Sequence, residues 1–330
     1  MDAVNAEAPV GVAIIGGGPA GLSAGLQLVR AHRRIAILDS NRPRHSATLR
    51  SHGFLTRDGA SPLELRRLGR EEFEAYPTAI FAQSIGREVM RLTADEALAA
   101  GFPDGIGFRV RGTGIRGSAD VEFTARRVLI AAGLTEELPP FPMIRAYYGT
   151  ALHSCVECDG FEKTDKPLVL IGETSDLFAR ALLISRFSSD LIVFTNGADT
   201  VRADQEAQLN AIGIRVERRP IDDIVGEKAE MTGVRLTDGE VVPRVGGFVR
   251  PRWHAPVEYL GDIDIARDDW GLVEVDVNGE TSARGIYAVG DVVPPGPQQL
   301  IIAAGSGARV AARLNMDMIR GALGVGRVDE

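Results

Sequence analysis

The pattern of apolar runs and glycine-rich turns along the chain predicts an α/β fold. Near the N-terminus, apolar residues 10–15 lead into Gly16-Gly17-Gly18-Pro19-Ala20-Gly21, and residues 22–30 have the apolar spacing of a helix. A second apolar run at residues 34–38 ends at Asp39. Short apolar runs of this kind are typical of parallel strands that are buried on both faces. The N-terminal stretch therefore predicts a βαβ unit.

The same pattern recurs in the middle of the chain. An apolar run at residues 167–171 ends at a glycine, residues 175–187 have helical spacing, and residues 191–194 form the next run. Two more apolar runs, residues 128–133 and 286–291, also lead into a glycine. The chain thus contains a second βαβ unit between two further strands.

Other stretches predict the elements that connect these units. Ser61-Pro62-Leu63-Glu64 has the residues of a helix start, and we expect the helix to run to about Tyr76. Residues 85–123 predict several strands with a short helix at 94–100. The polar residues 41–60 predict a loop, which is either solvated or in contact with a cofactor or substrate.

Length and charge narrow the class of protein. With 330 residues, 45% of them hydrophobic, the chain is long enough for two domains with real cores. Its formal charge of −8 argues against a nucleic-acid partner. No apolar run reaches membrane-spanning length, and the polar start does not have the pattern of a signal peptide. We therefore expect a soluble cytoplasmic protein without a membrane partner.

Each part of the first βαβ unit has a role in dinucleotide binding. Gly16 allows the tight turn, Gly18 lets the backbone approach a pyrophosphate, and Gly21 lets the helix pack on the strand. Asp39 follows Gly21 by eighteen residues and can bind ribose hydroxyls. The N-terminal unit therefore predicts a dinucleotide site.

The second unit departs from this pattern. Its turn reads Gly172-Glu173-Thr174-Ser175-Asp176-Leu177, so only the first of the three glycine positions is kept. Glu173 and Asp176 put negative charge beside a helix N-terminus that would otherwise attract a phosphate. The next strand ends in Thr195-Asn196-Gly197 without a ribose-binding acid, and the basic residue nearby is Arg202. We interpret this domain as kept for its shape, with a degenerate NAD(P)H site.

Cys155 and Cys158 are the only cysteines of the chain, and they form a CxxC motif followed by Asp159. This spacing suits a redox-active disulfide, and Asp159 can transfer a proton as a thiolate forms, whereas Glu157 should raise the thiol pKa values. A zinc site would have only His153 nearby, and a structural disulfide over so short a loop would stabilise the protein little. We therefore favour redox chemistry and predict no metal site.

Together these motifs resemble the low-molecular-weight thioredoxin reductases, which are pyridine nucleotide-disulfide oxidoreductases. The resemblance covers nearly the whole chain, in the family's order. It rests on Gly16 to Gly21, Ala131-Ala132-Gly133, the CxxC with Asp159-Gly160, and Gly285-Ile286-Tyr287-Ala288-Val289-Gly290-Asp291.

The resemblance implies the domain organisation. It implies two Rossmann-like, three-layer ββα dinucleotide-binding domains, the second inserted in the first. Residues 1–133 and 246–330 would form the FAD domain, and residues 134–245 the nicotinamide-type domain that carries the CxxC, with hinges near Leu134 and Gly246. The family also implies a homodimer.

The resemblance implies roles for individual residues as well. The helix that begins near Gln299 would direct its positive end at the flavin. Cys158 would face the flavin, Cys155 would exchange with the external thiol, and Asp159 matches the family's acid. The implied FAD-binding residues are Gly16, Gly18, Pro19, Ala20, Gly21, Asp39, Ala132, Gly133, Gly290, Asp291, Gln299 and Leu300.

Within this fold, the chain looks closer to FAD-dependent dithiol oxidases, which use oxygen as the oxidant. Residues 42–57 look like that subgroup, although Asp159 stands where many of its members have His. We therefore predict an enzyme that uses FAD and the Cys155–Cys158 pair to oxidise a small dithiol without NADPH. Residues 42–57 and 250–254 are expected to select the thiol substrate.

The same residues are compatible with three other functions. A thioredoxin reductase fed by NAD(P)H would act on a thioredoxin-like protein, and a related variant would take its electrons from ferredoxin. A flavin-based redox sensor would use the CxxC to report its redox state rather than to turn over a substrate. Reduction of the flavin by NADPH or by a dithiol would separate these alternatives.

Overall fold

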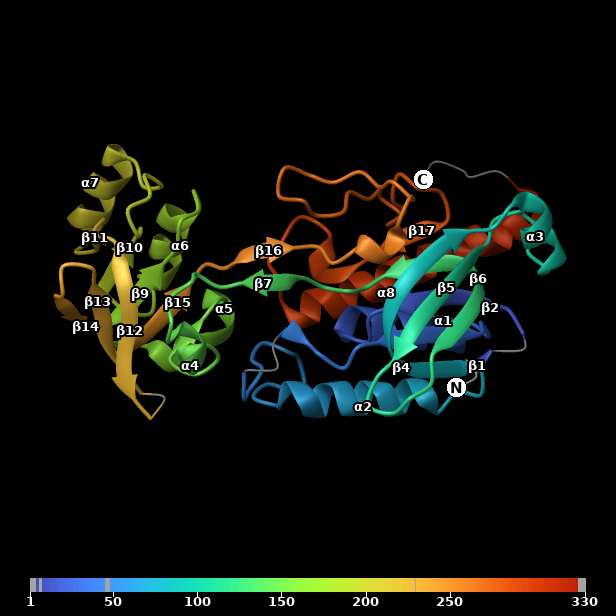
Figure 1. The fold of residues 1–330 in the computed structure, drawn as a ribbon, viewed down its shortest axis with the longest axis horizontal. Helices are drawn as coiled ribbons and strands as arrows, with labels where there is room; N and C mark the ends of the chain where they lie inside the picture. The colour runs from blue at the N-terminus through green and yellow to red at the C-terminus, as the bar shows by residue number, and fades with distance from the viewer. Residues whose placement is uncertain (1–3, 6–7, 45–47, 229, 326–330) are drawn as a thin grey trace. The chain divides into compact units, whose positions relative to one another are not determined.

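The computed structural model describes residues 4–5, 8–44, 48–228 and 230–325 (Figure 1). It divides into two compact units. The large unit is drawn from residues 1–46, 53–135 and 254–330, and the small unit from residues 47–52 and 136–253. The small unit is therefore inserted in the sequence of the large one.

The large unit is organised around a seven-stranded sheet in which β6 pairs with β1, β2, β5 and β17. The pairs among β2, β3, β6 and β17 are parallel, and their buried apolar residues are those of the runs seen in the sequence. The strands are β1 (Val4–Asn5), β2 (Val10–Ile15), β3 (Ile35–Asp39), β4 (Ala79–Arg91), β5 (Phe108–Gly114), β6 (Val121–Ile130) and β17 (Ile286–Ala288).

The long strands β4 and β6 each belong to two layers. Residues 79–83 of β4 pair in parallel with β3, whereas residues 84–91 pair antiparallel with β5. In the same way, β6 pairs with β5 through residues 121–125 and with β2 through residues 125–130. The antiparallel pairs around β5 therefore form a second β-layer on the parallel sheet.

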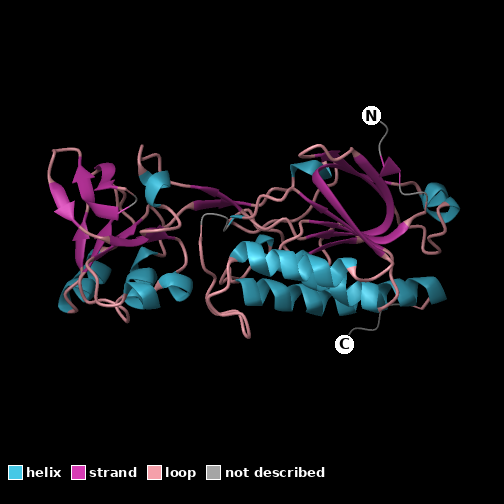
Figure 2. Cartoon of the chain, turned by 90° about the horizontal axis from the view of Figure 1, so that it is seen from below, coloured by secondary structure: helices cyan, strands magenta, loops and turns pink. Residues whose placement is uncertain are grey.

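Helices cover the other face of the parallel sheet (Figure 2). α1 contacts both α2 and α8, and its Leu22 and Leu28 pack in one core with Phe73 of α2 and with Val310 and Leu314 of α8. The helices of this unit are α1 (Pro19–Arg30), α2 (Pro62–Glu74), α3 (Ala94–Ala99) and α8 (Leu300–Leu323). The unit thus has the ββα layering that the family resemblance implies.

The small unit repeats this layering around a five-stranded parallel sheet. The strand order is β11-β10-β9-β15-β8, and β12, β13 and β14 form a separate antiparallel layer. The strands are β8 (Leu152–His153), β9 (Leu168–Ile171), β10 (Leu191–Phe194), β11 (Arg215–Glu217), β12 (Ile221–Glu227), β13 (Glu230–Leu236), β14 (Val241–Pro243) and β15 (Gly246–Val249). The helices are α4 (Ile144–Tyr147), α5 (Val156–Asp159), α6 (Leu177–Ile184) and α7 (Ala203–Ala211).

The predicted fold class is confirmed, and the boundary between the domains differs at one end. The first connection falls at Thr135–Glu136, close to the expected hinge at Leu134. The second falls after Trp253, not at Gly246, because β15 pairs with β9 inside the sheet of the small unit. The connecting segments β7 (Thr135–Glu137) and β16 (Arg252–His254) pair with each other.

None of the helices in the described part of the chain combines the length and the apolar character that a membrane crossing requires.

Candidate functional site

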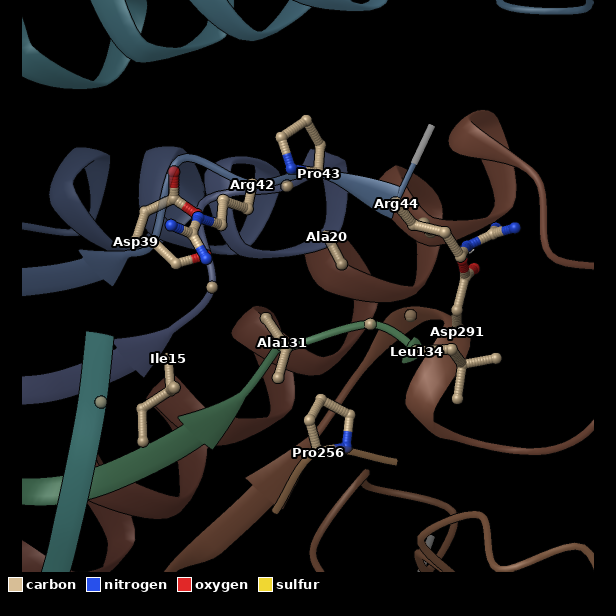
Figure 3. A pocket seen from close by; sticks show the side chains of 18 of the residues that line it. Ile15, Ala20, Asp39, Arg42, Pro43, Arg44, Ala131, Leu134, Pro256 and Asp291 are labelled. Atoms are coloured by element: carbon tan, nitrogen blue, oxygen red, sulfur yellow. Dashed lines mark hydrogen bonds and ion pairs between the residues drawn. The ribbon is translucent and has the colours of Figure 1, made fainter. Parts of the chain in front are cut away.

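A cavity of about 510 Å³ opens at the carboxyl end of the parallel strands in the large unit (Figure 3). Its lining comes from segments that are far apart in the sequence: the turn after β2, the end of β3, the stretch after β6, and the start of α8. This is the edge at which open α/β sheets bind dinucleotides.

The first glycine turn has the backbone geometry that a pyrophosphate needs. Gly16 has a φ of +112°, and a Cβ there would lie 2.2 Å from the carbonyl oxygen of Ala131. A Cβ on Gly21 would lie 1.9 Å from the carbonyl oxygen of Gly16, so this glycine allows the helix to pack on the turn. Among the described residues, no atom lies within 4 Å of the position that a Cβ on Gly18 would take, and no side chain caps the N-terminus of α1. The first N–H groups of α1 are therefore available to an anion.

Asp39 ends β3 at the edge of the cavity and is 7% exposed. Its carboxylate accepts the backbone N–H groups of Gly17 and Asn41, each at 3.1 Å, and also accepts from Arg66 of α2. Arg66 donates to the side chain of Asn41 as well, at 2.9 Å. These contacts hold the carboxylate in place beside the turn that the sequence predicts to bind pyrophosphate.

The C-terminal part of the chain supplies the far end of the cavity. α8 begins after Gln299, without a side-chain cap and without an acidic residue in its first turn, so its positive end is open. Asp291 lines the cavity and forms an ion pair of 2.9 Å with Arg44, and both side chains are 18% exposed (Figure 3). The side chain of Arg44 therefore links the N-terminal loop to the C-terminal segment.

Three buried polar atoms of the cavity-lining residues have no hydrogen-bond partner among the described residues. They are Arg66 Nε, Ser84 Oγ and Tyr259 Oη. Burial raises the pKa of Tyr259 far above its ordinary value, so its hydroxyl keeps its proton and can donate. A buried polar group without a partner costs about 1–3 kcal/mol, which indicates that a polar ligand completes this site. The open backbone cradle and these atoms together fit FAD.

The cavity lining includes every residue of the predicted FAD-binding set except Gly21, whose role is in packing. Arg66, Ser84 and Tyr259 are not among the residues predicted from the sequence. These side chains come from α2, β4 and the segment before β17, and no local motif marks them.

The CxxC lies in the small unit, at the short helix α5. Cys155 and Cys158 form a disulfide with their Cα atoms 5.3 Å apart. Cys155 is the N-cap residue of α5, and its Sγ accepts the backbone N–H of Cys158 at 3.2 Å. A sulfur at a helix N-terminus is stabilised as a thiolate, which makes Cys155 suited to exchange with an external thiol.

Asp159 follows the pair and is mostly buried, with a side chain that is 16% exposed. Burial raises its pKa to about 6; the charges of Lys163 and His52 oppose this rise, and that of Glu162 adds to it. A carboxyl group that titrates near neutral pH can both accept and return a proton. The proton-transfer role of Asp159 stays a prediction.

The second glycine turn, between β9 and α6, is occupied by its own side chains. Asp176 stands at the N-cap position of α6, but its side chain makes no capping bond. Its carboxylate accepts from Thr174 Oγ1 at 2.6 Å and from Arg180 Nε at 2.7 Å, and lies 3.0 Å from Arg250 Nε. Burial alone would raise the pKa of Asp176, but these bonds and charges outweigh it and hold the pKa below its ordinary value. An ionised carboxylate therefore stands at the N-terminus of α6.

The residues at the ends of the neighbouring strands are also engaged. Asn196 donates to Glu173 at 2.7 Å and accepts the N–H of Ile221 at 2.8 Å. Arg202, the basic residue that a nucleotide phosphate would need, pairs with Asp204 at 3.0 Å. The departures from the nucleotide motif are thus bonded to one another.

Two Rossmann-like units, one with a dinucleotide cavity and the other with a cysteine pair, define a disulfide oxidoreductase of the flavin-dependent class. The chain matches the model of the pyridine nucleotide-disulphide oxidoreductases over residues 10–307. It is 27% identical to a thioredoxin reductase of Streptomyces clavuligerus, over 91% of each chain. It is 24% identical to a probable thioredoxin reductase of Arthroderma benhamiae, over 92% of this chain and 79% of the relative.

Two solved structures are also similar. A putative thioredoxin reductase TrxB from Bacillus anthracis matches with a TM-score of 0.83 and 32% identity, over 94% of this chain and 99% of its own. The protein HlmI matches with a TM-score of 0.87 and 32% identity, over 98% of this chain and 96% of its own. This chain therefore belongs to the pyridine nucleotide-disulphide oxidoreductase family, as a flavin-dependent thiol-disulfide oxidoreductase of the thioredoxin reductase-like type.

Proposed function

We propose that the protein is an FAD-dependent dithiol oxidase. It takes two electrons from a small dithiol through Cys155 and Cys158 and transfers them to oxygen, and it is not fed by NAD(P)H. The observation that carries this proposal is the Asp176 carboxylate at the N-terminus of α6, bonded to Arg180 and paired with Arg250.

An ion pair built into the nucleotide turn opposes NAD(P)H binding in two ways. The carboxylate repels the pyrophosphate, and the arginine charges that would attract it are already neutralised. A Cβ added at Gly172 would lie 2.8 Å from the Cβ of Arg250, so the side chain after β15 also takes up the room beside this turn. Binding would require these contacts to break, which adds their free energy to the cost of association.

The residues of the small unit support the thiol chemistry. A substrate thiolate attacks Cys155 Sγ, the Cys155–Cys158 bond breaks, and Cys158 leaves as a thiolate. The second substrate thiol gives its proton to Asp159 and attacks the substrate sulfur of the mixed disulfide, which releases the cyclic disulfide and the Cys155 thiolate. FAD held in the cavity of the large unit would supply the acceptor for the two electrons when the protein disulfide re-forms, and the means of reducing oxygen. The balance is dithiol plus oxygen giving disulfide plus hydrogen peroxide.

Residues 48–57 are proposed to help select the thiol substrate. Their His52 pairs with Glu162 at 3.4 Å, three positions beyond Asp159, and both belong to the small unit. This contact supports a role for the loop in the surroundings of the CxxC. Residues 45–47 of the same loop lie outside the described residues.

The test is anaerobic reduction of the purified holoenzyme, followed by the visible absorbance of the flavin. We expect a small dithiol such as dithiothreitol to bleach the flavin and air to restore it with one peroxide formed per turnover, whereas NADPH and NADH have no effect. Bleaching by dithiothreitol without peroxide on reoxidation would point to another electron acceptor.

A second candidate is a thioredoxin reductase fed by NAD(P)H, which the names of several relatives favour. In that case NADPH or NADH would bleach the flavin within the time of one turnover, and oxidised thioredoxin would restore it. That result would overturn the oxidase proposal, because the Asp176 cluster would then be shown to open for the nucleotide.

A further inference from the structure

Two further side chains share the buried space around Asp159. His153 is 9% exposed and lies at the end of β8, two residues before the CxxC. Lys163 is 7% exposed and lies in the turn of helix formed by residues 161–163. A lysine and a histidine are rarely this buried without a partner of opposite charge. Asp159 lies 3.3 Å from His153, and Lys163 follows Asp159 by four residues in the next helical turn.

His153 lies directly beside the carboxylate of Asp159. Its Nε2 lies 3.3 Å from Asp159 Oδ1, while its Nδ1 is buried without a hydrogen-bond partner among the described residues. Burial and the charge of Lys163 lower the pKa of His153 to about 3, against a weaker effect of the Gly149 backbone, so the ring stays neutral.

Lys163 supplies the positive charge of this group. Its ammonium lies 6.0 Å from the ring centre of Phe248, a buried residue of β15. Its positive charge favours the ionised form of Asp159. Burial lowers the pKa of Lys163 itself, while Asp159 and Glu162 raise it and Lys166 lowers it. The charged and titratable groups that act on Asp159 are thus Lys163, Glu162, His52 and His153.

We propose that His153 and Lys163 are positioning residues that hold the Asp159 carboxylate ionised and oriented to accept the proton of a thiol at the Cys155–Cys158 pair. His153 fixes Oδ1, which leaves Oδ2 to take the proton. Lys163 offsets the cost of a buried negative charge beside the disulfide. In the step, the S–H bond breaks, an O–H bond forms on Asp159, and the proton returns to solvent after the disulfide re-forms.

The inference rests on the thiol chemistry of the proposed function, but not on the choice of electron acceptor. The test measures the rate of anaerobic flavin bleaching by dithiothreitol between pH 5.5 and 9 in the parent and in Lys163→Met. The ratio of the two rates removes the pH dependence of dithiothreitol itself. Loss of the positive charge of Lys163 should raise the pKa of Asp159, so we expect the midpoint of the rate profile to move up by about one to two pH units. The rate at pH 6.5 should then fall by about three- to twentyfold. At pH 9 the rates agree within about twofold, since Asp159 is then ionised in both.

Four variants separate positioning from mere stability. Lys163→Arg keeps the charge and is expected to restore the parental profile. Lys166→Met removes an exposed lysine three positions further on and should leave the profile unchanged. His153→Phe should lower the plateau rate, and His153→Gln, which keeps a donor, should recover most of it. Retention of FAD and thermal unfolding are measured on each variant to identify any that fails to fold.

The outcomes distinguish the two proposals. If dithiothreitol does not bleach the parent flavin, the proposed function fails. The pH profile is then measured by alkylation of the reduced CxxC with iodoacetamide. In that assay, Lys163→Met should shift the midpoint of thiolate formation to higher pH. If Lys163→Met and Lys166→Met superimpose on the parent in the measured profile, the positioning role is overturned even where the oxidase reaction stands.

Discussion

At the scale of single residues, the reactivity of the CxxC is set by opposing local charges. The N–H of Cys158 stabilises a thiolate on Cys155, whereas Glu157 Oε2 lies 3.9 Å from Cys155 Sγ and disfavours it. Glu157 is exposed, so water weakens its effect but does not remove it. The pair is therefore less acidic than its helical position alone would make it.

Replacing Glu157 with Gln should raise the reactivity of Cys155. Removal of the negative charge lowers the thiol pKa, and we expect alkylation of the reduced protein by iodoacetamide at pH 7 to become about two- to fivefold faster. Glu227→Gln, on the antiparallel layer of the same unit, is the control and should leave the rate unchanged. An unchanged rate in Glu157→Gln would mean that solvent screens this carboxylate completely.

The hydroxyl of Tyr259 is buried in the cavity lining and has no hydrogen-bond partner among the described residues. Replacing Tyr259 with Phe should weaken FAD binding by about fivefold, the value of one neutral hydrogen bond of about 1 kcal/mol. The measurement is FAD titration of the apoprotein followed by flavin fluorescence. Tyr76→Phe, whose hydroxyl accepts from Arg30 outside the cavity, should bind FAD as the parent does. Equal affinities in the two variants would show that the Tyr259 hydroxyl has no role in binding FAD.

At the scale of secondary-structure elements, the start of α6 depends on one acidic side chain. Asp176 stands at the N-cap position and pairs with two arginines, and the Arg250 side chain is only 13% exposed. Loss of the carboxylate leaves a buried guanidinium without its counter-charge. The second nucleotide turn is thus held together by the contacts that oppose nucleotide binding.

Asp176→Asn should therefore lower the free energy of unfolding by about 1–3 kcal/mol at pH 7, measured with urea. Because the folded-state pKa of Asp176 is depressed, its contribution is present above the unfolded pKa and is lost as the pH falls through the folded pKa. The difference between parent and variant should then shrink in acid. Asp204→Asn, which removes an exposed ion pair at the start of α7, should change little at either pH. A difference that persists undiminished at low pH would contradict the assignment of the effect to the charge.

At the scale of the whole molecule, the cavity and the CxxC belong to different units. All residues that line the cavity come from the large unit, and the disulfide and Asp159 come from the small one. Each unit has its own buried core. The two units are therefore expected to respond separately to loss of the cofactor.

Removing FAD should destabilise the large unit and leave the stability of the small unit unchanged. A ligand at one hundred times its dissociation constant stabilises the unit that binds it by about 2.7 kcal/mol. We expect the transition reported by cavity-facing probes to occur at lower temperature in the apoprotein. Hydrogen exchange of the backbone amides in the buried strands β9 and β10 of the small unit should report an unchanged midpoint. Equal shifts in both transitions would show that the units unfold as one.

The sequence alone determined the elements and motifs whose causes are local. The strands at residues 10–15 and 191–194 have the predicted bounds, because a buried parallel strand is apolar along its whole length. The role of Gly16 follows from a backbone conformation that only glycine adopts easily, and the CxxC spacing allows the disulfide by itself. The departures of residues 172–177 from the glycine pattern are also read from the sequence, because a missing glycine or an added acid acts locally.

Only the tertiary structure decided which distant side chains meet. Ser84 and Tyr259 reach the cavity from segments far from the glycine turn, and the pairing of β15 inside the small unit moved the second boundary from Gly246 to Trp253. The grouping of Lys163 with His153 around Asp159 likewise depends on how the turn after α5 folds back on the sheet. Such contacts depend on packing between elements, and no spacing within the sequence encodes them.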